Sequence, residues 1–345
     1  MKDKDRYWDC LDQAMEASHG GRTDEAMAWL EEALRAHPEG AEAHNGRGEI
    51  LWDEDAVDDA LREFEKAIAA DPKFTAAHLN RAEILIEELG EFEHVLEVCD
   101  ELLAGRPELP RPDRSLQAEI YYLKSKALFY LDDLGGALFL VRRAIKAGGD
   151  QPVYRAFEGQ ILFELGRYEE ARRVLEHAVA LDSESPHAVY HFALAQERAG
   201  DPEEAQRAFA QANSLDPQHY PLPEVVDDEV FRGAVSEALA NLPRSIRDYV
   251  ENVPVLVEDF PSVEMVESEN VSPQILGIFV GVPRTEASVS SQPPDLDRVM
   301  IFKRNLEKIC SDSEELIEQI QITVRHEIGH YLGLDEDDME RLGLA

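Results

Sequence analysis

Positive charge is scarce in this sequence. There are 34 lysines and arginines against 72 aspartates and glutamates, for a formal net charge of −38 at pH 7. Proteins that bind nucleic acid need a lysine- and arginine-rich surface to neutralise phosphates, and anionic lipid surfaces attract basic segments for the same reason. The charge therefore argues against nucleic acid and membrane surfaces as partners.

Cysteines and long apolar runs are also few. Cys10, Cys99 and Cys310 lie far apart in sequence, so neither a disulfide framework nor a cysteine-based zinc site is expected. There is no apolar run of transmembrane length, and the first residues lack the apolar core of a secretory signal. We expect a soluble cytoplasmic protein. Its 345 residues, 44% of them hydrophobic, suffice for about two domains.

A helical repeat recurs along the first two thirds of the chain. Each copy places an alanine, a large apolar residue and another alanine on one helical face, at i, i+4 and i+7. Twelve positions before the first alanine stands a small residue, which lets two antiparallel helices approach closely. The copies are Ala26, Leu30, Ala33; Ala60, Phe64, Ala67; Ala137, Val141, Ala144; Ala171, Leu175, Ala178; and Ala205, Phe209, Ala212, with small residues Ala14, Gly48, Ser125, Gly159 and Ala193.

A degenerate copy lies between the second and fourth repeats. It keeps Ala82 in register, but places His94, Val98 and Glu101 at the packing positions. The proline-rich segment 105–115 then lengthens the period and predicts a loop.

This pattern resembles the tetratricopeptide repeat, a helical hairpin with a period of about 34 residues. The resemblance implies that residues 1–217 form an all-α solenoid of about six hairpins, whose first helices line a concave groove. Only Asn45 and Lys126 match the residues with which some of these repeats clamp a C-terminal carboxylate. An acidic groove, with Glu42 and Glu49 in its lining, favours an extended basic or apolar peptide as partner. Alternatively, the acidic residues only keep the solenoid soluble.

The last third has a different organisation. Residues 218–227, with two prolines, predict a linker, and residues 228–345 predict a small α+β domain. A long helix is expected to open with a capping box at Ser311 and Glu314 and to end at Gly333. Its expected apolar stripe is Leu316, Ile317, Ile320 and Val324, and the expected shorter elements are helices at 228–242 and 245–252 and strands at 253–258, 274–282 and 298–303.

The long helix carries a metal-binding pattern, H-E-x-x-H. His326 and His330 stand at i and i+4, so both imidazoles project from one helix face and can hold one Zn²⁺ ion. Glu327 lies between them in sequence and is the candidate general base. Gly333 allows the chain to turn back and return a third ligand. We expect Glu336 to be that ligand.

Two neighbouring acids, Asp335 and Asp337, are alternative third ligands. The whole region from 228 resembles a family of minimal zincin-like metallopeptidases in three blocks: NLPRSIRDYVENVPVLVEDFP, ILGIFVGVPRTE and HEIGHYLGLDEDDMERLG. The resemblance implies a short sheet packed against the active-site helix, a zinc site and peptidase activity. Met339 follows Gly333 too closely to act as the methionine turn of larger zincins. Strand 298–303 is expected either to pair with substrate as an edge strand or to be an ordinary strand.

The leading hypothesis is a zinc metallopeptidase of the H-E-x-x-H type, whose repeats recruit protein substrates or partners. The alternative is a non-catalytic repeat scaffold or adaptor with a structural or degenerate zinc site. Glu327 favours the peptidase hypothesis, because a purely structural metal site does not need a general base.

Overall fold

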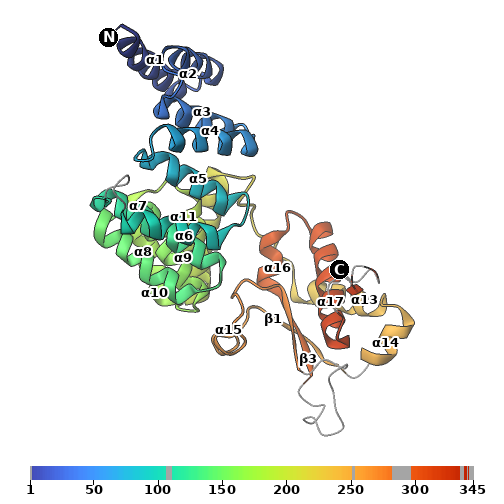
Figure 1. Ribbon diagram of the computed structural model, residues 1–345. Coiled ribbons are helices and arrows are strands. Elements are labelled where there is room, and N and C mark those ends of the chain that lie inside the picture. Colours follow the sequence, from blue (N-terminus) through green and yellow to red (C-terminus); the bar gives the residue numbers. More distant parts are fainter. Residues whose placement is uncertain are drawn as a thin grey trace. The chain divides into compact units, whose positions relative to one another are not determined.

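The computed structural model describes residues 2–105, 111–250, 253–281, 297–334, 338–339 and 341 (Figure 1). The chain divides into two compact units, Met1–Ile161 and Leu162–Ala345. The described part of the first unit is built of helices. The second unit joins further helices to a three-stranded sheet.

The first unit is a series of antiparallel helix pairs, in which the successive helices between residues 2 and 148 pack against one another along the chain. A last helix, α9 (Pro152–Glu164), runs across the boundary between the two units. The other helices are α1 (Lys2–His19), α2 (Thr23–Ala36), α3 (Ala41–Asp53), α4 (Val57–Ala70), α5 (Thr75–Glu87), α6 (Phe92–Ala104), α7 (Arg114–Tyr130) and α8 (Leu134–Gly148).

The repeat positions pack as the sequence predicts. Ala60, Phe64 and Ala67 on α4 are fully buried. A Cβ placed on Gly48 of α3 would lie 2.5 Å from a ring carbon of Phe64, so only glycine fits there. In a later hairpin, the Ser125 hydroxyl donates a hydrogen bond of 2.7 Å to the Ala137 carbonyl, which satisfies a buried polar group between two helices. The all-α repeat architecture is confirmed.

The third hairpin corrects one sequence-based assignment. The buried residues of α6 are Val95, Cys99 and Leu102, one position after the predicted His94, Val98 and Glu101. The cause is the preceding turn, which has four residues between α5 and α6 but three between α3 and α4. The packing residue is the fourth residue of the second helix in both hairpins, so the longer turn moves the whole pattern by one position.

The second unit begins with helical hairpins and continues into the mixed domain. Its helices are α10 (Tyr168–Leu181), α11 (Pro186–Ala199), α12 (Pro202–Leu215), α13 (Asp228–Ala240), α14 (Arg244–Val250), α15 (Val263–Glu269), α16 (Lys303–Ile309) and α17 (Ser313–Leu332). The strands are β1 (Val255–Glu258), β2 (Gly277–Val280) and β3 (Arg298–Phe302). All three strands are shorter than predicted, and α15 and α16 were not predicted.

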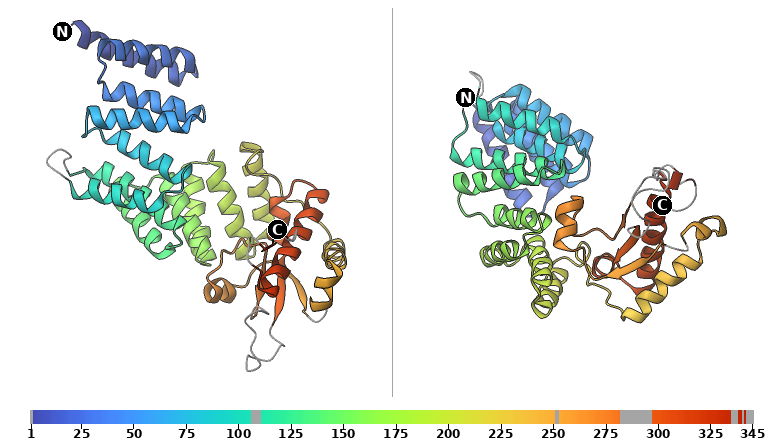
Figure 2. Two further views of the ribbon diagram at one scale, coloured as in Figure 1. Left: turned by 45° about the vertical axis from the view of Figure 1, so that its right-hand side comes forward. Right: turned by 90° about the horizontal axis from the view of Figure 1, so that it is seen from below.

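The sheet has the order β1-β3-β2, with β1 parallel and β2 antiparallel to β3. Of the two alternatives for strand 298–303, the substrate-pairing edge strand is therefore wrong and the ordinary sheet strand is confirmed: β3 is central and carries the fully buried Val299, Ile301 and Phe302. Among the described strands, β1 and β2 each pair on one side only. The edge nearest the candidate site is thus β2, because α17 packs against β2 and β3 (Figure 2).

The core of the mixed domain lies between α17, α13 and the sheet. Leu316, Ile320 and Val324 form the predicted apolar stripe of α17 and are buried. Ile317 does not belong to it, since 38% of its surface is exposed. Because this stripe packs into the core, the rotation of α17 about its axis is fixed, and so are the directions of the side chains on its other faces.

The ends of α17 also differ from the prediction at one terminus. Asp312 is the N-cap, and its carboxylate accepts hydrogen bonds of 2.9 Å from the backbone N–H groups of Glu314 and Glu315. Ser311 instead donates to the Glu315 side chain, so the capping arrangement lies one residue further along than predicted. At the other end Gly333 has φ of 75°, which confirms it as the residue that stops the helix.

Helix α16 ties together several parts of the second unit through buried charges. The Lys308 ammonium lies 2.6 Å from the Glu197 carboxylate on α11, and both side chains are largely buried. Glu307 accepts a backbone hydrogen bond of 3.1 Å from Val226 in the predicted linker, and Lys303 pairs with Asp228 at the start of α13. The segment before α13 is thus held against α16 by specific hydrogen bonds.

Candidate metal centre

Two imidazoles converge at the C-terminal end of α17. His326 and His330 are one turn apart, with 3.0 Å between their Nε2 atoms. Their ring planes are nearly perpendicular, at 89°, and the ring centroids are 4.5 Å apart. The i, i+4 spacing therefore brings both ring nitrogens to one point, as the sequence predicts.

The pair suits a zinc ion in chemistry and in spacing. Two Zn–N bonds of about 2.1 Å at a tetrahedral angle separate the nitrogens by about 3.4 Å. The observed 3.0 Å differs from this by a few tenths of an ångström, which a small side-chain rotation provides. The same separation suits a hydrogen bond from one ring N–H to the other ring nitrogen. The two rings can therefore share either a proton or a metal ion.

The Glu327 side chain lies against strand β2. It is only 7% exposed, and a Cβ placed on Gly277 would lie 3.0 Å from its Cγ and 2.9 Å from Thr323 Cγ2. The strand can pass this close to α17 only because residue 277 has no side chain. Sequence reasoning missed this role, although a glycine inside an apolar strand is a signal of close backbone approach.

A second glycine makes room for Met339. The Met339 side chain is fully buried, and a Cβ on Gly329 would lie 2.3 Å from its Sδ. Gly329 stands between the two histidines in sequence, so Met339 packs directly against the helix that carries them. Its spacing from Gly333 predicted no role for Met339 as a methionine turn. The glycine inside the motif was the available signal for its packing.

The predicted third metal ligand does not lie among the residues that the structure describes. Glu336, Asp335 and Asp337 all fall outside the described residues, and their roles stay predictions. Within the described ranges, no three or more His, Cys, Asp or Glu side chains gather in a way that could hold a metal ion. The structure thus brings His326 and His330 together, and a third ligand for a metal ion between them stays a prediction.

The repeat residues that resemble a carboxylate clamp are engaged with acids of the protein itself. The Asn45 amide donates to Glu49 at 2.8 Å, and the Lys126 ammonium lies 3.4 Å from Glu83 and also contacts Glu87. The Asn80 amide bonds to both Asn45 and Glu49, at 3.1 Å and 2.9 Å.

Comparison with known families divides the chain in two. Residues 250–344 match the family described as zincin-like metallopeptidase. Residues 11–73, 54–110 and 122–186 match one tetratricopeptide repeat family, and residues 162–222 match a second. No curated protein matches the sequence.

Solved structures resemble the helical part. PilF of Pseudomonas aeruginosa aligns over 63% of this chain and 95% of its own, with 16% identity and a TM-score of 0.51. PilW, a type IV pilus biogenesis factor, aligns over 61% and 94%, with 19% identity and a TM-score of 0.53. A chain of the APC/C hetero-tetramer Cut9–Hcn1 aligns over 63% and 44%, with 14% identity and a TM-score of 0.53. At these identities the likeness shows the fold alone.

In the part of the chain that the structure covers, none of the helices is both long enough and apolar enough to span a bilayer.

Proposed function

Because this chain joins tetratricopeptide repeats over residues 11–222 to a zincin-like metallopeptidase domain over residues 250–344, we propose that it is a zinc-dependent peptidase whose repeats recruit protein or peptide partners. One observation carries the catalytic part of the proposal. The Nε2 atoms of His326 and His330 lie 3.0 Å apart on the helix that also carries the buried Glu327.

In this proposal His326 and His330 hold Zn²⁺, and Glu336 completes the ligand set. Asp335 and Asp337 are the alternatives to Glu336. Zinc bound there supplies Lewis acidity, which polarises a peptide carbonyl and lowers the pKa of water toward about 7.

The Glu327 carboxylate performs the proton transfers. It accepts a proton from the attacking water and passes it to the amine that leaves. Its side chain is 7% exposed and is held beside β2. A carboxylate restrained in this way keeps its direction relative to the two histidines, which favours repeated proton transfer at one place.

Strand β2 is the proposed guide for the substrate backbone. A peptide that pairs with the outer edge of β2 adds a strand to the sheet through main-chain hydrogen bonds. Gly277, the first residue of this strand, lies against Thr323 and Glu327. A peptide aligned along β2 therefore passes the proposed general base.

The test compares zinc content and peptide cleavage in three proteins. Glu327→Gln is expected to keep zinc, measured by elemental mass spectrometry, and to lose about 10²–10⁴-fold in cleavage rate. His330→Gln is expected to lose both zinc and cleavage. Glu318→Gln, an exposed position on the same helix, is the matched control and should behave like the wild type.

Two outcomes would contradict the proposal. Unchanged cleavage by Glu327→Gln removes this residue from the mechanism. A wild-type protein that retains zinc but cleaves no member of a broad peptide library supports the alternative, a repeat scaffold with a structural zinc site.

A further inference from the structure

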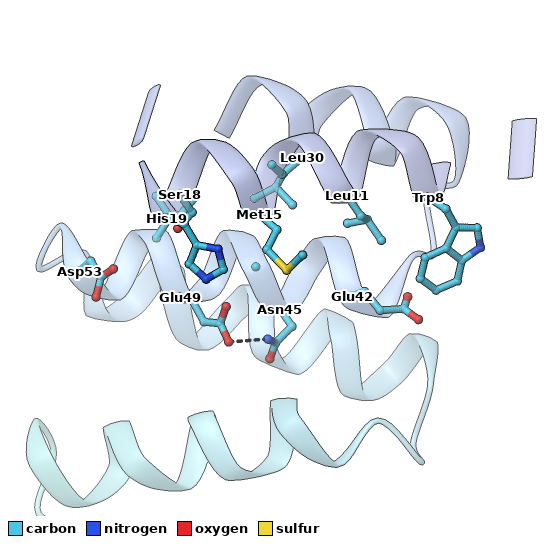
Figure 3. Close-up of a pocket in the computed structure, with 13 residues that line it drawn as sticks. Trp8, Leu11, Met15, Ser18, His19, Leu30, Glu42, Asn45, Glu49 and Asp53 are labelled. Carbon is cyan, nitrogen blue, oxygen red and sulfur yellow. Dashed lines mark hydrogen bonds between the residues drawn. The ribbon is translucent and has the colours of Figure 1, made fainter. Parts of the chain in front are cut away.

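A pocket of about 590 Å³ opens between α1 and α3 in the first unit (Figure 3). Its volume lies within the range of about 300–1,000 Å³ that is typical of ligand sites. The two helices contribute different chemistry to it. Its lining includes Trp8, Leu11 and Met15 from α1 and Glu42, Glu49 and Asp53 from α3.

The α1 side of the pocket is mainly apolar and open to solvent, with Ser18 and His19 as its polar residues at one end. Trp8, Leu11 and Met15 stand at i, i+3 and i+7, so they form one stripe on the helix. Trp8 is 46% exposed and Met15 is 58% exposed. When another apolar surface covers large side chains that are this exposed to water, the free energy of the system falls.

The α3 side of the pocket is acidic. With a rise of about 1.5 Å per residue, Glu42 and Glu49 stand about 10 Å apart along the helix, and Glu49 and Asp53 about 6 Å. None of the described residues that line the pocket is a lysine or an arginine. The pocket thus presents a row of carboxylates opposite a helix face on which the apolar stripe of Trp8, Leu11 and Met15 is followed by Ser18 and His19 (Figure 3).

Hydrogen bonds hold two of these carboxylates in place. The Tyr7 hydroxyl donates to Glu42 at 2.8 Å. The amides of Asn45 and Asn80 donate to Oε1 of Glu49 at 2.8 Å and 2.9 Å. A carboxylate that is already oriented loses less side-chain entropy when a ligand binds.

We propose that this pocket binds a segment of a partner protein that carries lysine or arginine side chains on one side and leucine-like side chains on the other. The inference rests on the proposed recruiting role of the repeats and specifies the chemistry of the partner. Cationic side chains complement Glu42, Glu49 and Asp53, while apolar side chains cover Trp8 and Met15. A second copy of this chain is a poor occupant, because each copy carries a net charge of −38.

In an extended segment, alternating lysine and leucine places the two chemistries on opposite sides. Successive lysines are then about 6.6 Å apart, close to the spacing of about 6 Å between Glu49 and Asp53. A capped heptapeptide of alternating lysine and leucine is therefore the probe. Matched peptides replace every lysine with glutamate, or every leucine with serine.

The experiment is isothermal titration calorimetry on the full chain at low and high salt. The lysine–leucine peptide is expected to bind at least tenfold more tightly than either matched peptide, and more weakly at high salt because the attraction is screened. Glu49→Gln combined with Asp53→Asn should weaken binding at least tenfold. The amide that replaces the Glu49 carboxylate still offers an oxygen to Asn45 and Asn80, so the variant removes charge and keeps those hydrogen bonds. Met15→Ser should also weaken binding.

The control variant combines Glu25→Gln with Glu31→Gln. These acids lie on α2, are 50% and 52% exposed and do not line the pocket. This variant removes the same charge and should bind the probe like the wild type. Equal loss in both double variants would show a general charge effect and overturn the pocket assignment.

Three other results would also overturn the inference. These are the absence of binding by the lysine–leucine peptide, undiminished binding by the pocket variant, and a dimer of the wild type that the pocket variant abolishes in sedimentation. Zinc content and cleavage of a short peptide are measured on the same variants, with thermal unfolding as the folding check. If the peptide fails to bind while zinc content and cleavage are normal, only the pocket assignment is rejected. If the wild type does not cleave the short peptide, the proposed function is rejected.

Discussion

The close packing at Gly277 leaves no room for a side chain beside Glu327, the proposed general base. A Cβ at this position would lie 2.9 Å from Thr323 Cγ2, 3.0 Å from Glu327 Cγ and 3.1 Å from the Met300 carbonyl oxygen. The backbone oxygen belongs to the central strand and cannot move aside as a side chain can. Gly277→Ala is therefore expected to displace Glu327 and to lower kcat about tenfold to a hundredfold, with zinc retained.

Steady-state cleavage and metal analysis check this prediction together. Gly233→Ala on the exposed face of α13 is the control, because nothing lies within 4 Å of its added Cβ. If Gly277→Ala cleaves as fast as the control variant, the strand does not position Glu327.

Gly329 and Met339 give a prediction about stability. The Cβ of Gly329→Ala would lie 2.3 Å from the Met339 Sδ, and that side chain is fully buried. Overpacking of this kind costs about 1–3 kcal/mol in the free energy of unfolding. Gly233→Ala should instead stabilise the protein by about 0.5–1 kcal/mol, because alanine favours an open helical position. Chemical denaturation of both variants checks the opposite signs.

His191 predicts a pH dependence of stability. Burial lowers the pKa of this imidazole from 6.5 to about 3, and its Nδ1 lies 3.0 Å from the His187 carbonyl oxygen. As pH falls below 6.5, the unfolded chain takes up a proton that the folded protein does not. This residue therefore costs up to about 1.4 kcal/mol of stability per pH unit toward pH 3.

His191→Gln removes this titration and keeps a hydrogen-bond donor at the same position. Unfolding free energies measured between pH 7 and pH 5 should fall less steeply for the variant than for the wild type. Parallel slopes would show that His191 takes up a proton equally in the folded and the unfolded protein, which contradicts the lowered pKa.

The juxtaposition of His326 and His330 was predictable from sequence because its geometry is local. A spacing of i, i+4 fixes the relation of His326 to His330 within one helix, whatever surrounds it. The roles of Gly277 and Met339 depend on which strand and which later residue approach the same helix. Those contacts join positions distant in sequence, and local patterns do not encode them.

Helix α16 is a whole element that local sequence patterns did not predict. It has seven residues, begins directly after β3 and buries Lys303, Glu307 and Lys308. A short charged segment is typical of exposed chain, so the sequence predicted no helix there. Its burial depends on Glu197, Asp228 and the Val226 backbone, which lie on separate segments.

The Lys308–Glu197 pair links α16 to α11 and can be tested directly. Burial lowers the pKa of Lys308, so its charge is tolerated mainly because Glu197 lies 2.6 Å away. Glu197→Gln should cost about 3 kcal/mol of unfolding free energy, since it leaves a buried charge without its counterion. The double variant Glu197→Gln/Lys308→Met should recover most of that loss.

A double-mutant cycle by chemical denaturation measures this coupling. Additive losses from the two single substitutions would mean that the elements hold together without the ion pair.

At the scale of the whole molecule, the second unit contains both helical hairpins and the sheet domain. Besides the Lys308–Glu197 pair, the Arg198 guanidinium donates to the Pro261 carbonyl at 2.7 Å. Glu164 accepts from Ser272 at 2.7 Å and from Gln274 at 2.8 Å. These contacts cross the boundary near residue 218 that the change in sequence pattern predicts, so the repeats and the mixed domain are not independent here.

This predicts a difference between two fragments. A fragment of residues 162–345 should unfold in one cooperative transition, whereas residues 218–345 should be markedly less stable, because Lys308 loses its counterion and surface buried by the hairpins is exposed. Circular dichroism during thermal unfolding compares them. Equal midpoints would show that the mixed domain folds without the hairpins.

The pocket on α1 and α3 and the histidine pair on α17 belong to different units of one chain. If both proposals hold, a partner held at the first site meets the second site at an effective concentration set by the length of chain between its two contact points. Each site can then be weak on its own. Free peptides without the basic–apolar segment would be cut slowly, and the distance from that segment to the cleaved bond would become a determinant of which proteins are processed.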